Sequence, residues 1–300
     1  MLITGVNGFV GSAARNFFKK EYDVYGIDII GNQDEKTYIV DIKTEQLEEI
    51  LNKIIPDVVI HAAGGANVSF SIAYPQEDFD NSVRVFYNMI ETLHKLNIRS
   101  KVIFLSSAAV YGNVSEKCIG EKTEVKPISP YGLHKKLCED IADYYVKQYQ
   151  MDITILRVFS VYGPGLKKQI MWDMYQKYMK NGKIELFGTG EEARDFIYIE
   201  DLIRCIDYIL QSKVQNGVYN IANGRALTIK SVAEIFATEL SGKAEVYFNH
   251  VERKGDPEYW CANINAIKEL GYEQKVDIQE GIRRYISWAQ GVTGELESGC

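Results

Sequence analysis

The chain has 300 residues, of which 46% are hydrophobic, and this is enough to bury the core of one large α/β domain or of two lobes. Its formal net charge of -7 argues against general binding to nucleic acid or to an anionic membrane, because both need a basic surface. The five cysteines are far apart without a C-x-x-C pair, and the four histidines are scattered. We therefore expect no metal site, a reducing cytoplasmic location, and neither nucleic acid nor membrane as a partner.

The first predicted element is a strand at residues 2–4, which leaves no room for a signal peptide after Met1. A turn with glycines at three-residue spacing follows, and then a helix. Gly5 permits a sharp turn, Gly8 lets the backbone approach a pyrophosphate, and Gly11 allows the helix to pack closely. This predicts a dinucleotide cradle, although the spacing differs from G-x-G-x-x-G and a merely structural turn would show the same pattern.

A second predicted strand, at residues 22–28, ends in an acid. Asp28 follows the glycine turn at about the interval at which dinucleotide-binding folds carry the carboxylate that holds the adenosine ribose. A carboxylate here repels a 2′-phosphate, and no arginine stands beside it, so the pattern favours NAD over NADP. A third short strand, at 38–42, would place Asp41 and Ile42 where an adenine could lie.

Two further predicted strands end at the edge of a parallel sheet where ligands bind. Residues 58–65 form a buried strand that opens into a loop of small residues, including Ala62 and Ala63, which let a flat cofactor lie close. Residues 101–112 form another, and Ser107 near its end could hydrogen bond a substrate oxygen. A serine that only caps a turn would give the same local pattern. Helical patterns lie before and between these strands, at residues 44–55 and 77–97.

A long predicted helix begins near Tyr131. Lys135 is four residues further along, so the two side chains share one helix face. The nearby ammonium favours the phenolate form of Tyr131, which can take a proton from a sugar hydroxyl. The pair is therefore a candidate acid/base catalyst, although an exposed tyrosine beside a solvated lysine would also fit this spacing.

In their order along the chain, these features resemble the extended short-chain dehydrogenase/reductases of the sugar-nucleotide epimerase/dehydratase type. The resemblance runs nearly from end to end and includes further segments at residues 107–112, 156–164, 186–190, 194–198 and 255–260. It implies an α/β fold, with a Rossmann-type doubly wound parallel sheet and a smaller C-terminal α/β substrate lobe. The implied domains are 1–162 for NAD, with a return segment at 195–212, and 163–300 for the sugar nucleotide.

The resemblance also assigns the site residues. Ser107, Tyr131 and Lys135 would form the catalytic set, and Tyr131 and Lys135 would also contact NAD. The other residues around NAD would be Gly5, Gly8, Phe9, Val10, Gly11, Asp28, Asp41, Ile42, Ala62, Ala63 and Asn81. The substrate would be held by Ser107, Ser160, Phe187, Arg194, Arg253 and Tyr259.

One of these substrate positions departs from the family. Ser160 stands where the family most often has asparagine, and its shorter side chain offers a different contact to the sugar or diphosphate. Arg194 and Arg253 could clamp the diphosphate, or could instead form surface ion pairs. Phe187 would contact the nucleotide base. Tyr259, by similarity to UDP-galactose 4-epimerases, would limit the size of the sugar.

The residues that follow Ser107 separate the reactions of this family. Dehydratases and decarboxylases that resemble this chain carry a glutamate there, whereas this chain has Ala108 and Ala109, and a methyl group cannot move a proton. The resemblance then implies NAD-dependent 4-epimerisation of a nucleoside-diphosphate sugar through a transient 4-keto intermediate, in a homodimer. The nucleotide base and the sugar stay open.

Two alternatives use the same residues. A 4-ketoreductase or 4-dehydrogenase of a nucleoside-diphosphate sugar would need the same catalytic set, and Asp28 favours the epimerase because a stand-alone reductase would more usually draw on NADPH. A catalytically silent NAD-binding regulator is disfavoured, because such a protein has no chemical need for Ser107, Tyr131 and Lys135 together.

Overall fold

The computed structural model describes residues 1–298 except 45, 115, 241–243 and 252–257. At its centre is a sheet of seven parallel strands in the order β10-β6-β5-β4-β1-β2-β3. These strands are β1 (Leu2–Thr4), β2 (Tyr25–Asp28), β3 (Thr37–Ile39), β4 (Val58–His61), β5 (Lys101–Ser107), β6 (Asp152–Val158) and β10 (Gly217–Ile221). The chain moves outward from β1 to β3 and then returns to β4, so the strand order reverses between β1 and β4.

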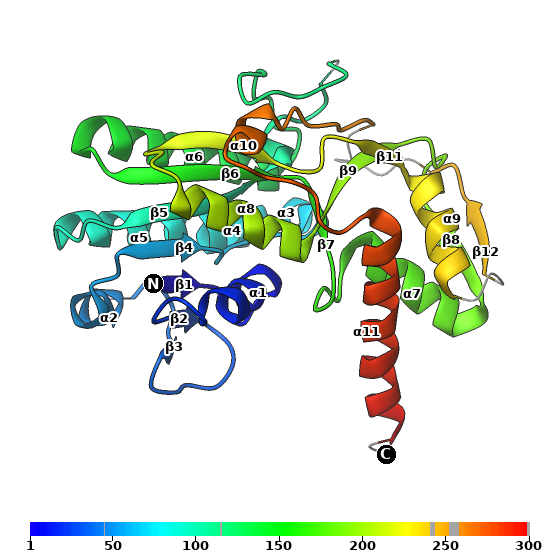
Figure 1. The fold of residues 1–300 in the computed structure, drawn as a ribbon, viewed down its shortest axis with the longest axis horizontal. Coiled ribbons are helices and arrows are strands. Elements are labelled where there is room, and N and C mark those ends of the chain that lie inside the picture. The colour runs from blue at the N-terminus through cyan, green and yellow to red at the C-terminus, as the bar shows by residue number, and fades with distance from the viewer. Residues whose placement is uncertain (45, 115, 241–243, 252–257, 299–300) are drawn as a thin grey trace.

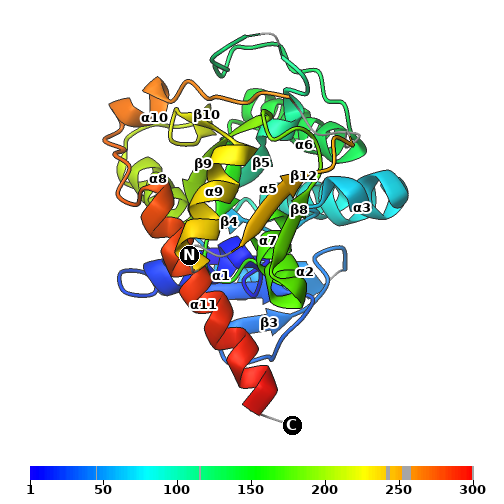
Figure 2. The ribbon, with the colours of Figure 1, turned by 90° about the vertical axis from the view of Figure 1, so that its right-hand side faces the viewer.

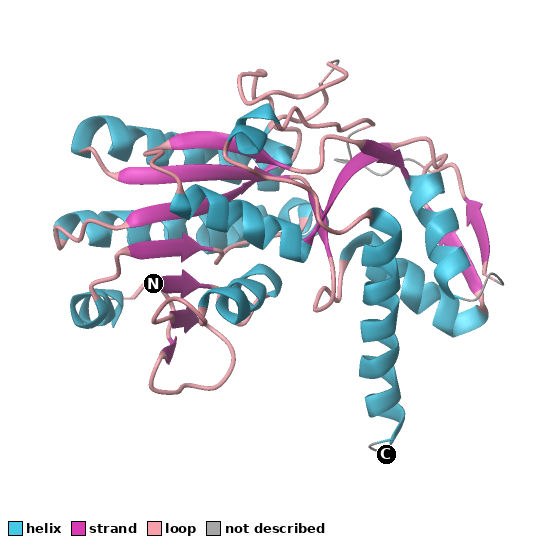
Figure 3. Ribbon diagram, viewed as in Figure 1, coloured by secondary structure: helices cyan, strands magenta, loops and turns pink. Residues whose placement is uncertain are grey.

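Helices cover both faces of this sheet (Figure 3). They are α1 (Phe9–Phe18), α2 (Gln46–Ile54), α5 (Val85–Lys95), α6 (Pro130–Tyr149) and α8 (Ile199–Gln211), while α3 (Val68–Ala73) and α4 (Pro75–Phe79) pack against α6. Successive residues of a strand face opposite sides, and the two cores follow this rule. Ile3 and Ile103 pack in the core that includes α1 and α8. Leu2 and Val102 pack in the core that includes α2, α5 and α6.

The rest of the chain forms a smaller lobe beyond the carboxyl ends of the central strands (Figure 1). It holds a three-stranded sheet of β7 (Ser160–Tyr162), β9 (Ala193–Tyr198) and β11 (Ala226–Thr228), and a parallel pair of β8 (Lys183–Leu186) and β12 (Glu245–Phe248). Its helices are α7 (Gln169–Asn181), α9 (Ile229–Leu240) and α11 (Ile278–Ser298), while α10 (Asn265–Glu269) lies against β10. Figure 2 views the molecule from this lobe, where α9 and α11 pack together.

The predicted fold class, a doubly wound parallel sheet with a smaller α/β lobe, is confirmed. The course of the chain between the smaller lobe and the central sheet is more complex than the predicted return segment at 195–212. Strand β9 pairs with β7 and β11 in the small sheet, α8 packs beside α1 on the central sheet, and β10 then pairs with β6 at the sheet edge. The predicted helix at 77–97 is divided by a π-helical turn, Asp80–Arg84, between α4 and α5. Within the described residues, no helix combines the length and apolar character needed to cross a membrane.

Candidate active site

In the turn between β1 and α1, backbone segments lie so close to one another that side chains would not fit between them. Gly5 has a φ of +66°, and Gly8 N donates to the Gly5 carbonyl at 3.0 Å. A Cβ atom at Gly11 would lie 2.0 Å from the same carbonyl oxygen. The N-cap residue is Gly8, so no capping side chain competes for the N–H groups of the first turn, where Phe9 and Val10 lie. This helix end fits the pyrophosphate of a dinucleotide.

Asp28 ends β2 beside this turn, and it is 9% exposed. One carboxylate oxygen accepts a hydrogen bond from Asn7 N at 2.8 Å, and the other accepts one from Ile29 N at 2.8 Å. The second oxygen also accepts from Ile30 N at 3.3 Å, so it is the first oxygen that keeps acceptor capacity for a ribose hydroxyl. The nearby Arg15 guanidinium is 3.5 Å from the Asp34 carboxylate rather than in an ion pair with Asp28. A carboxylate without a basic partner among the described residues fits the ribose of NAD and repels the phosphate of NADP.

Lys43 joins two residues predicted to contact the cofactor. Its ammonium lies 3.5 Å from the Asp41 carboxylate and donates to the Asn81 side-chain oxygen at 3.3 Å. Asn81 belongs to the π-helical turn, a distortion that is frequent at functional sites. Ile42 is buried, and its carbonyl accepts from the Asn88 side chain at 3.4 Å. Lys43 was not predicted, and its sequence position beside Asp41 gives no sign that it reaches Asn81.

The loop after β4 is fixed to the end of β1. Thr4 accepts a hydrogen bond from Ala63 N at 3.2 Å on its hydroxyl, and from Ala62 N at 3.2 Å on its carbonyl. The same hydroxyl is 3.1 Å from Nδ1 of the buried His61. Burial, with a smaller contribution from the Lys135 ammonium, lowers the pKa of His61 to about 3. The imidazole is therefore neutral and bonds to Thr4, and Thr4 holds the two alanines against the cradle.

The three predicted catalytic residues lie at the carboxyl edge of the central sheet. Ser107 ends β5, and its hydroxyl accepts from Ala109 N at 3.2 Å. Lys135 is buried, and its ammonium donates to the Leu105 carbonyl at 2.9 Å. The same ammonium is 5.9 Å from the centre of the Tyr131 ring. Lys135 thus connects the end of β5 to the tyrosine. The four-residue spacing predicted its approach to Tyr131, but not its contact with β5.

The start of α6 can approach the turn after β5 because Gly132 has no side chain. A Cβ atom there would lie 2.4 Å from the Ala109 carbonyl oxygen. Pro130 stands in the first turn of the helix, and the Ser129 hydroxyl caps it by accepting from Gly132 N at 3.2 Å. Tyr131 N donates to the hydroxyl of Ser71 on α3 at 3.0 Å. These contacts fix the helix turn that carries Tyr131.

A buried pair beside the catalytic residues was not predicted. His134 Nδ1 is 2.6 Å from an Asp78 carboxylate oxygen, and the pair joins α6 to α4. The other oxygen has no hydrogen-bond partner among the described residues, and a Cβ atom on Gly65 would lie 2.3 Å from it. The sequence offered one signal, a histidine between Tyr131 and Lys135, but the aspartate is far away in the chain.

A second buried group lies behind the site. The Arg157 guanidinium pairs with the Glu139 carboxylate at 2.7 Å, and both side chains are at least nine-tenths buried. Ser106 donates to Glu139 at 2.5 Å, Arg157 donates to the Tyr111 hydroxyl at 2.9 Å, and that hydroxyl donates to Asn220 at 2.7 Å. This network ties β5, β6 and β10 to α6, the helix of Tyr131.

Three predicted substrate residues lie around β9. Ser160 begins β7 and pairs with Phe196 of β9. Arg194 lies on β9, its guanidinium 5.8 Å from the centre of a Trp260 ring, and it donates to the neighbouring Ala193 carbonyl at 2.9 Å. Tyr259 forms a parallel bridge with Ala193 and is 43% exposed. The backbone of Tyr259 therefore lies beside Ala193, one residue from Arg194.

Of two further predicted substrate residues, the structure describes Phe187 but not Arg253. Phe187 follows β8, is 48% exposed, and has the Lys177 ammonium 5.8 Å from its ring centre. Arg253 lies outside the described residues. The roles of all six substrate residues remain predictions.

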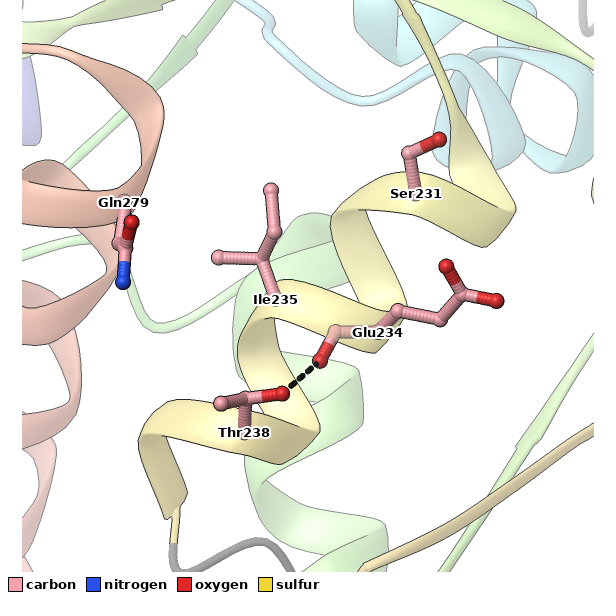
Figure 4. Close-up of a pocket in the computed structure, with 5 residues that line it drawn as sticks. All are labelled: Ser231, Glu234, Ile235, Thr238 and Gln279. Carbon is pink, nitrogen blue, oxygen red and sulfur yellow. Dashed lines mark hydrogen bonds between the residues drawn. The ribbon is translucent and has the colours of Figure 1, made fainter.

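Away from these residues, a pocket lies between α9 and the start of α11 (Figure 4). It is lined by Ser231, Glu234, Ile235, Thr238 and Gln279, and none of these is a predicted site residue. The Thr238 hydroxyl there bonds within its own helix, to the Glu234 carbonyl at 2.8 Å. In the part of the chain that the structure describes, no three His, Cys, Asp or Glu side chains gather as a metal site would need.

Comparisons with known proteins identify the family of this chain. Residues 1–222 match the model of the NAD dependent epimerase/dehydratase family. A Methanocaldococcus jannaschii protein named as a provisional UDP-glucose 4-epimerase is 31% identical, over 96% of this chain and 97% of that protein.

Two solved structures resemble the fold closely. The UDP-glucose 4-epimerase of Thermotoga maritima, solved with UDP-glucose, has a TM-score of 0.89 at 26% identity, over 97% of this chain and 99% of that one. The UDP-glucuronic acid 4-epimerase of Bacillus cereus, solved with UDP-glucuronic acid and NAD, has a TM-score of 0.88 at 25% identity, with the same coverage. The family predicted from the sequence is confirmed. This chain belongs to the NAD dependent epimerase/dehydratase family of extended short-chain dehydrogenase/reductases, and its cofactor is NAD.

Proposed function

We propose that this protein is a UDP-sugar 4-epimerase. The observation that carries the proposal is the placement of Ser107, Tyr131 and Lys135 at the sheet edge beside the dinucleotide cradle. The turn after Ser107 supports it too. Ala108 and Ala109 are buried there, so no carboxylate lies where dehydration or decarboxylation would need one. Relatives that are named as UDP-sugar 4-epimerases favour uridine as the base.

The proposed chemistry gives each catalytic residue a role. NAD, when bound, supplies a hydride acceptor and donor. Tyr131 takes the proton from the sugar 4-hydroxyl and later returns it, and the Lys135 ammonium lies 5.9 Å from the centre of its ring. Ser107 hydrogen bonds the same sugar oxygen. The sugar passes through a transient 4-keto state and turns before its C4 hydrogen returns on the opposite face.

The substrate lobe is proposed to hold the nucleotide. Arg194 is a candidate clamp for the diphosphate, because guanidinium groups bind phosphate oxygens in pairs. Tyr259, its neighbour through Ala193, would limit the size of the sugar. Phe187, exposed at the end of β8, would contact the base. Ser160 and Arg253 complete the proposed set.

We also propose a cytoplasmic homodimer formed through α5 and α6. Tyr87, Tyr144 and Tyr149 support this, since their side chains are 44%, 53% and 40% exposed on these two helices. Light scattering behind a sizing column would measure the mass in solution. A monomer at micromolar concentration would contradict the dimer.

The test of the function uses freshly purified protein without added cofactor. Mass spectrometry of the ligands released on denaturation identifies the bound dinucleotide, and chromatography follows UDP-glucose, UDP-galactose, UDP-glucuronic acid and UDP-N-acetylglucosamine. We expect about one NAD per chain and interconversion of one pair of C4 epimers. A protein that releases no NAD, and that turns over only 4-keto sugars in a second assay with NADPH added, would favour the ketoreductase. NAD reduction without a second epimer would favour the dehydrogenase, and bound NAD without any turnover would favour the silent regulator.

A further inference from the structure

Two cysteines that are far apart in the sequence lie on neighbouring backbone segments. Ile119 and Ala262 form a parallel β-bridge. Ile119 N donates to the Cys261 carbonyl at 2.7 Å, and Asn263 N donates to the Ile119 carbonyl at 2.8 Å. In a parallel pairing, the preceding residues are neighbours as well. Cys118 therefore lies beside Cys261.

Both thiols lie outside the buried core at this bridge. Ile119 and Ala262 are buried, with exposures of 0% and 2%. Cys118, which lies in a bend just before the bridge, is exposed, and Cys261 is half-buried. Cys118 is near enough to raise the pKa of the Cys261 thiol. Paired strands lie about 4.8 Å apart, and a disulfide needs Cα atoms about 4.4 to 6.8 Å apart, so the backbone spacing at the bridge lies within that range.

We propose that Cys118 and Cys261 form a reversible disulfide by exchange with an oxidised low-molecular-weight thiol. The Cys118 thiolate attacks the reagent disulfide, forms a mixed disulfide and releases one reduced thiol. The Cys261 thiolate then attacks the Cys118 sulfur and releases the second. The protein loses two thiol protons and two electrons, and one reagent disulfide becomes two thiols.

The order of these steps follows from the surroundings of each sulfur. Burial raises the pKa of Cys261, and the nearby Asp195 and Cys118 raise it further. Cys261 therefore reacts slowly with reagents in solution. Cys118 is exposed and can meet the reagent first. Once Cys118 carries the mixed disulfide, Cys261 already lies beside it and can attack without a further encounter in solution.

The disulfide would restrain the segment that carries Tyr259, one of the proposed substrate residues. Trp260 donates from its indole to the Gly112 carbonyl at 3.0 Å, and Ala262 N donates to the Asp195 carboxylate at 3.1 Å. Tyr259, two residues before Cys261, interacts with the Cys261 side chain. A disulfide would tie this segment to the loop of Cys118. Its expected effect, a several-fold rise in the KM of the sugar nucleotide, rests on the proposed function.

The site itself is tested by peptide mapping of the full chain, with Cys300→Ser as the background in every sample. Reduced protein is incubated with oxidised glutathione, alkylated and digested with trypsin, which releases Cys118 in peptide 118–122 and Cys261 in peptide 255–268. We expect these two peptides joined, a loss of two thiols per chain, and full recovery with dithiothreitol. Cys118→Ser and Cys261→Ser should each abolish the joined pair. Glutathione that stays on Cys118, or a bond to Cys138 or Cys205, would overturn the proposal.

Activity is measured separately on the same samples. We expect KM to rise on oxidation of the parent and to stay constant in Cys118→Ser under the same treatment. A joined peptide pair with an unchanged KM would overturn the link to the substrate site. If the reduced protein converts no sugar nucleotide, the proposed function fails, while the peptide map still decides whether the disulfide forms.

Discussion

Tyr131 carries the proton in the proposed reaction, and its ring lies 5.9 Å from the Lys135 ammonium. We predict that Tyr131→Phe lowers turnover by about 10²- to 10⁴-fold, the usual contribution of a positioned acid/base group. NAD should stay bound, because the glycine turn and Asp28 are unchanged. Released NAD and epimer formation are measured on one preparation. Tyr144→Phe, on the exposed side of the same helix, is the matched control. Equal turnover in the two variants would contradict the catalytic assignment.

Asp195 is buried on β9, and burial raises its pKa to about 6, although backbone N–H groups of Asn223 and Ala262 oppose the shift. Between pH 4 and 6 the folded protein keeps a proton that the unfolded chain loses. The free energy of unfolding should therefore fall as the pH rises through this window, by about 3 kcal/mol from this group.

Urea unfolding at several pH values would measure this effect. Asp195→Asn removes this titration. The difference in the free energy of unfolding between the parent and the variant should therefore change by about 3 kcal/mol from pH 4 to 6 and stay constant above pH 7. The variant is also expected to be less stable throughout, because an amide nitrogen would face a backbone N–H. A difference that does not depend on pH would contradict the shifted carboxyl.

Single residues were predictable where the spacing is local. Tyr131 and Lys135 are one helix turn apart, and a turn of α6 is enough to bring them together. The contact between His134 and Asp78 was not predictable, because it depends on how α4 packs against α6. Helical periodicity identifies the face of each helix, but it does not identify which residue of another helix will meet it.

At the level of elements, the turn from β1 to α1 depends on one missing side chain. In Gly11→Ala, the new methyl group would lie 2.0 Å from the Gly5 carbonyl oxygen, so the turn has to open. We predict loss of most bound NAD, measured by release from denatured protein. The control is Gly291→Ala in α11, where a Cβ atom meets nothing within 4 Å. That change should raise the free energy of unfolding by about 0.5 to 1 kcal/mol and leave NAD bound. Equal NAD content would contradict the cradle.

Elements with strong periodicity were predicted well, and elements that depend on their neighbours were not. The buried strands β4 and β5 and the helix α6 could be identified from the sequence because each has a long or regular apolar pattern. The π-helical turn before α5 was missed, since apolar spacing does not distinguish one extra residue in a turn. Strand β10 was also missed, because its five residues become a strand only by pairing with β6.

At the scale of the molecule, the buried Arg157 and Glu139 pair joins the central sheet to α6. We predict that Glu139→Ala lowers the free energy of unfolding by about 3 to 5 kcal/mol, because it leaves a buried guanidinium without its counter-ion. Asp143→Ala is the control on the same helix. Its pair with Lys147 is 2.7 Å long but solvent-exposed, and its loss should cost less than about 1 kcal/mol. Denaturant unfolding compares the two, and equal losses would contradict the role of the network.

The arrangement of the whole molecule could be predicted only through the resemblance to a family. Composition and periodicity indicate strands and helices in alternation, and these favour a parallel sheet. They do not indicate where the chain leaves the sheet or where it returns, because both depend on packing between distant segments. The predicted division at 162 and 163 and the return segment at 195–212 stay predictions, and β10 lies outside that segment.

The late position of β10 in the chain also affects how the protein is made. A ribosome delivers β6 long before it delivers β10, and until Ile221 emerges the nascent sheet ends in an unpaired β6 edge. Asn220, the partner of Tyr111 in the buried network, is missing for the same period. An open parallel edge of this kind can pair with other chains. Translation of the first part of the smaller lobe, from β7 to β9, therefore falls inside the interval in which the nucleotide-binding half is most prone to aggregate.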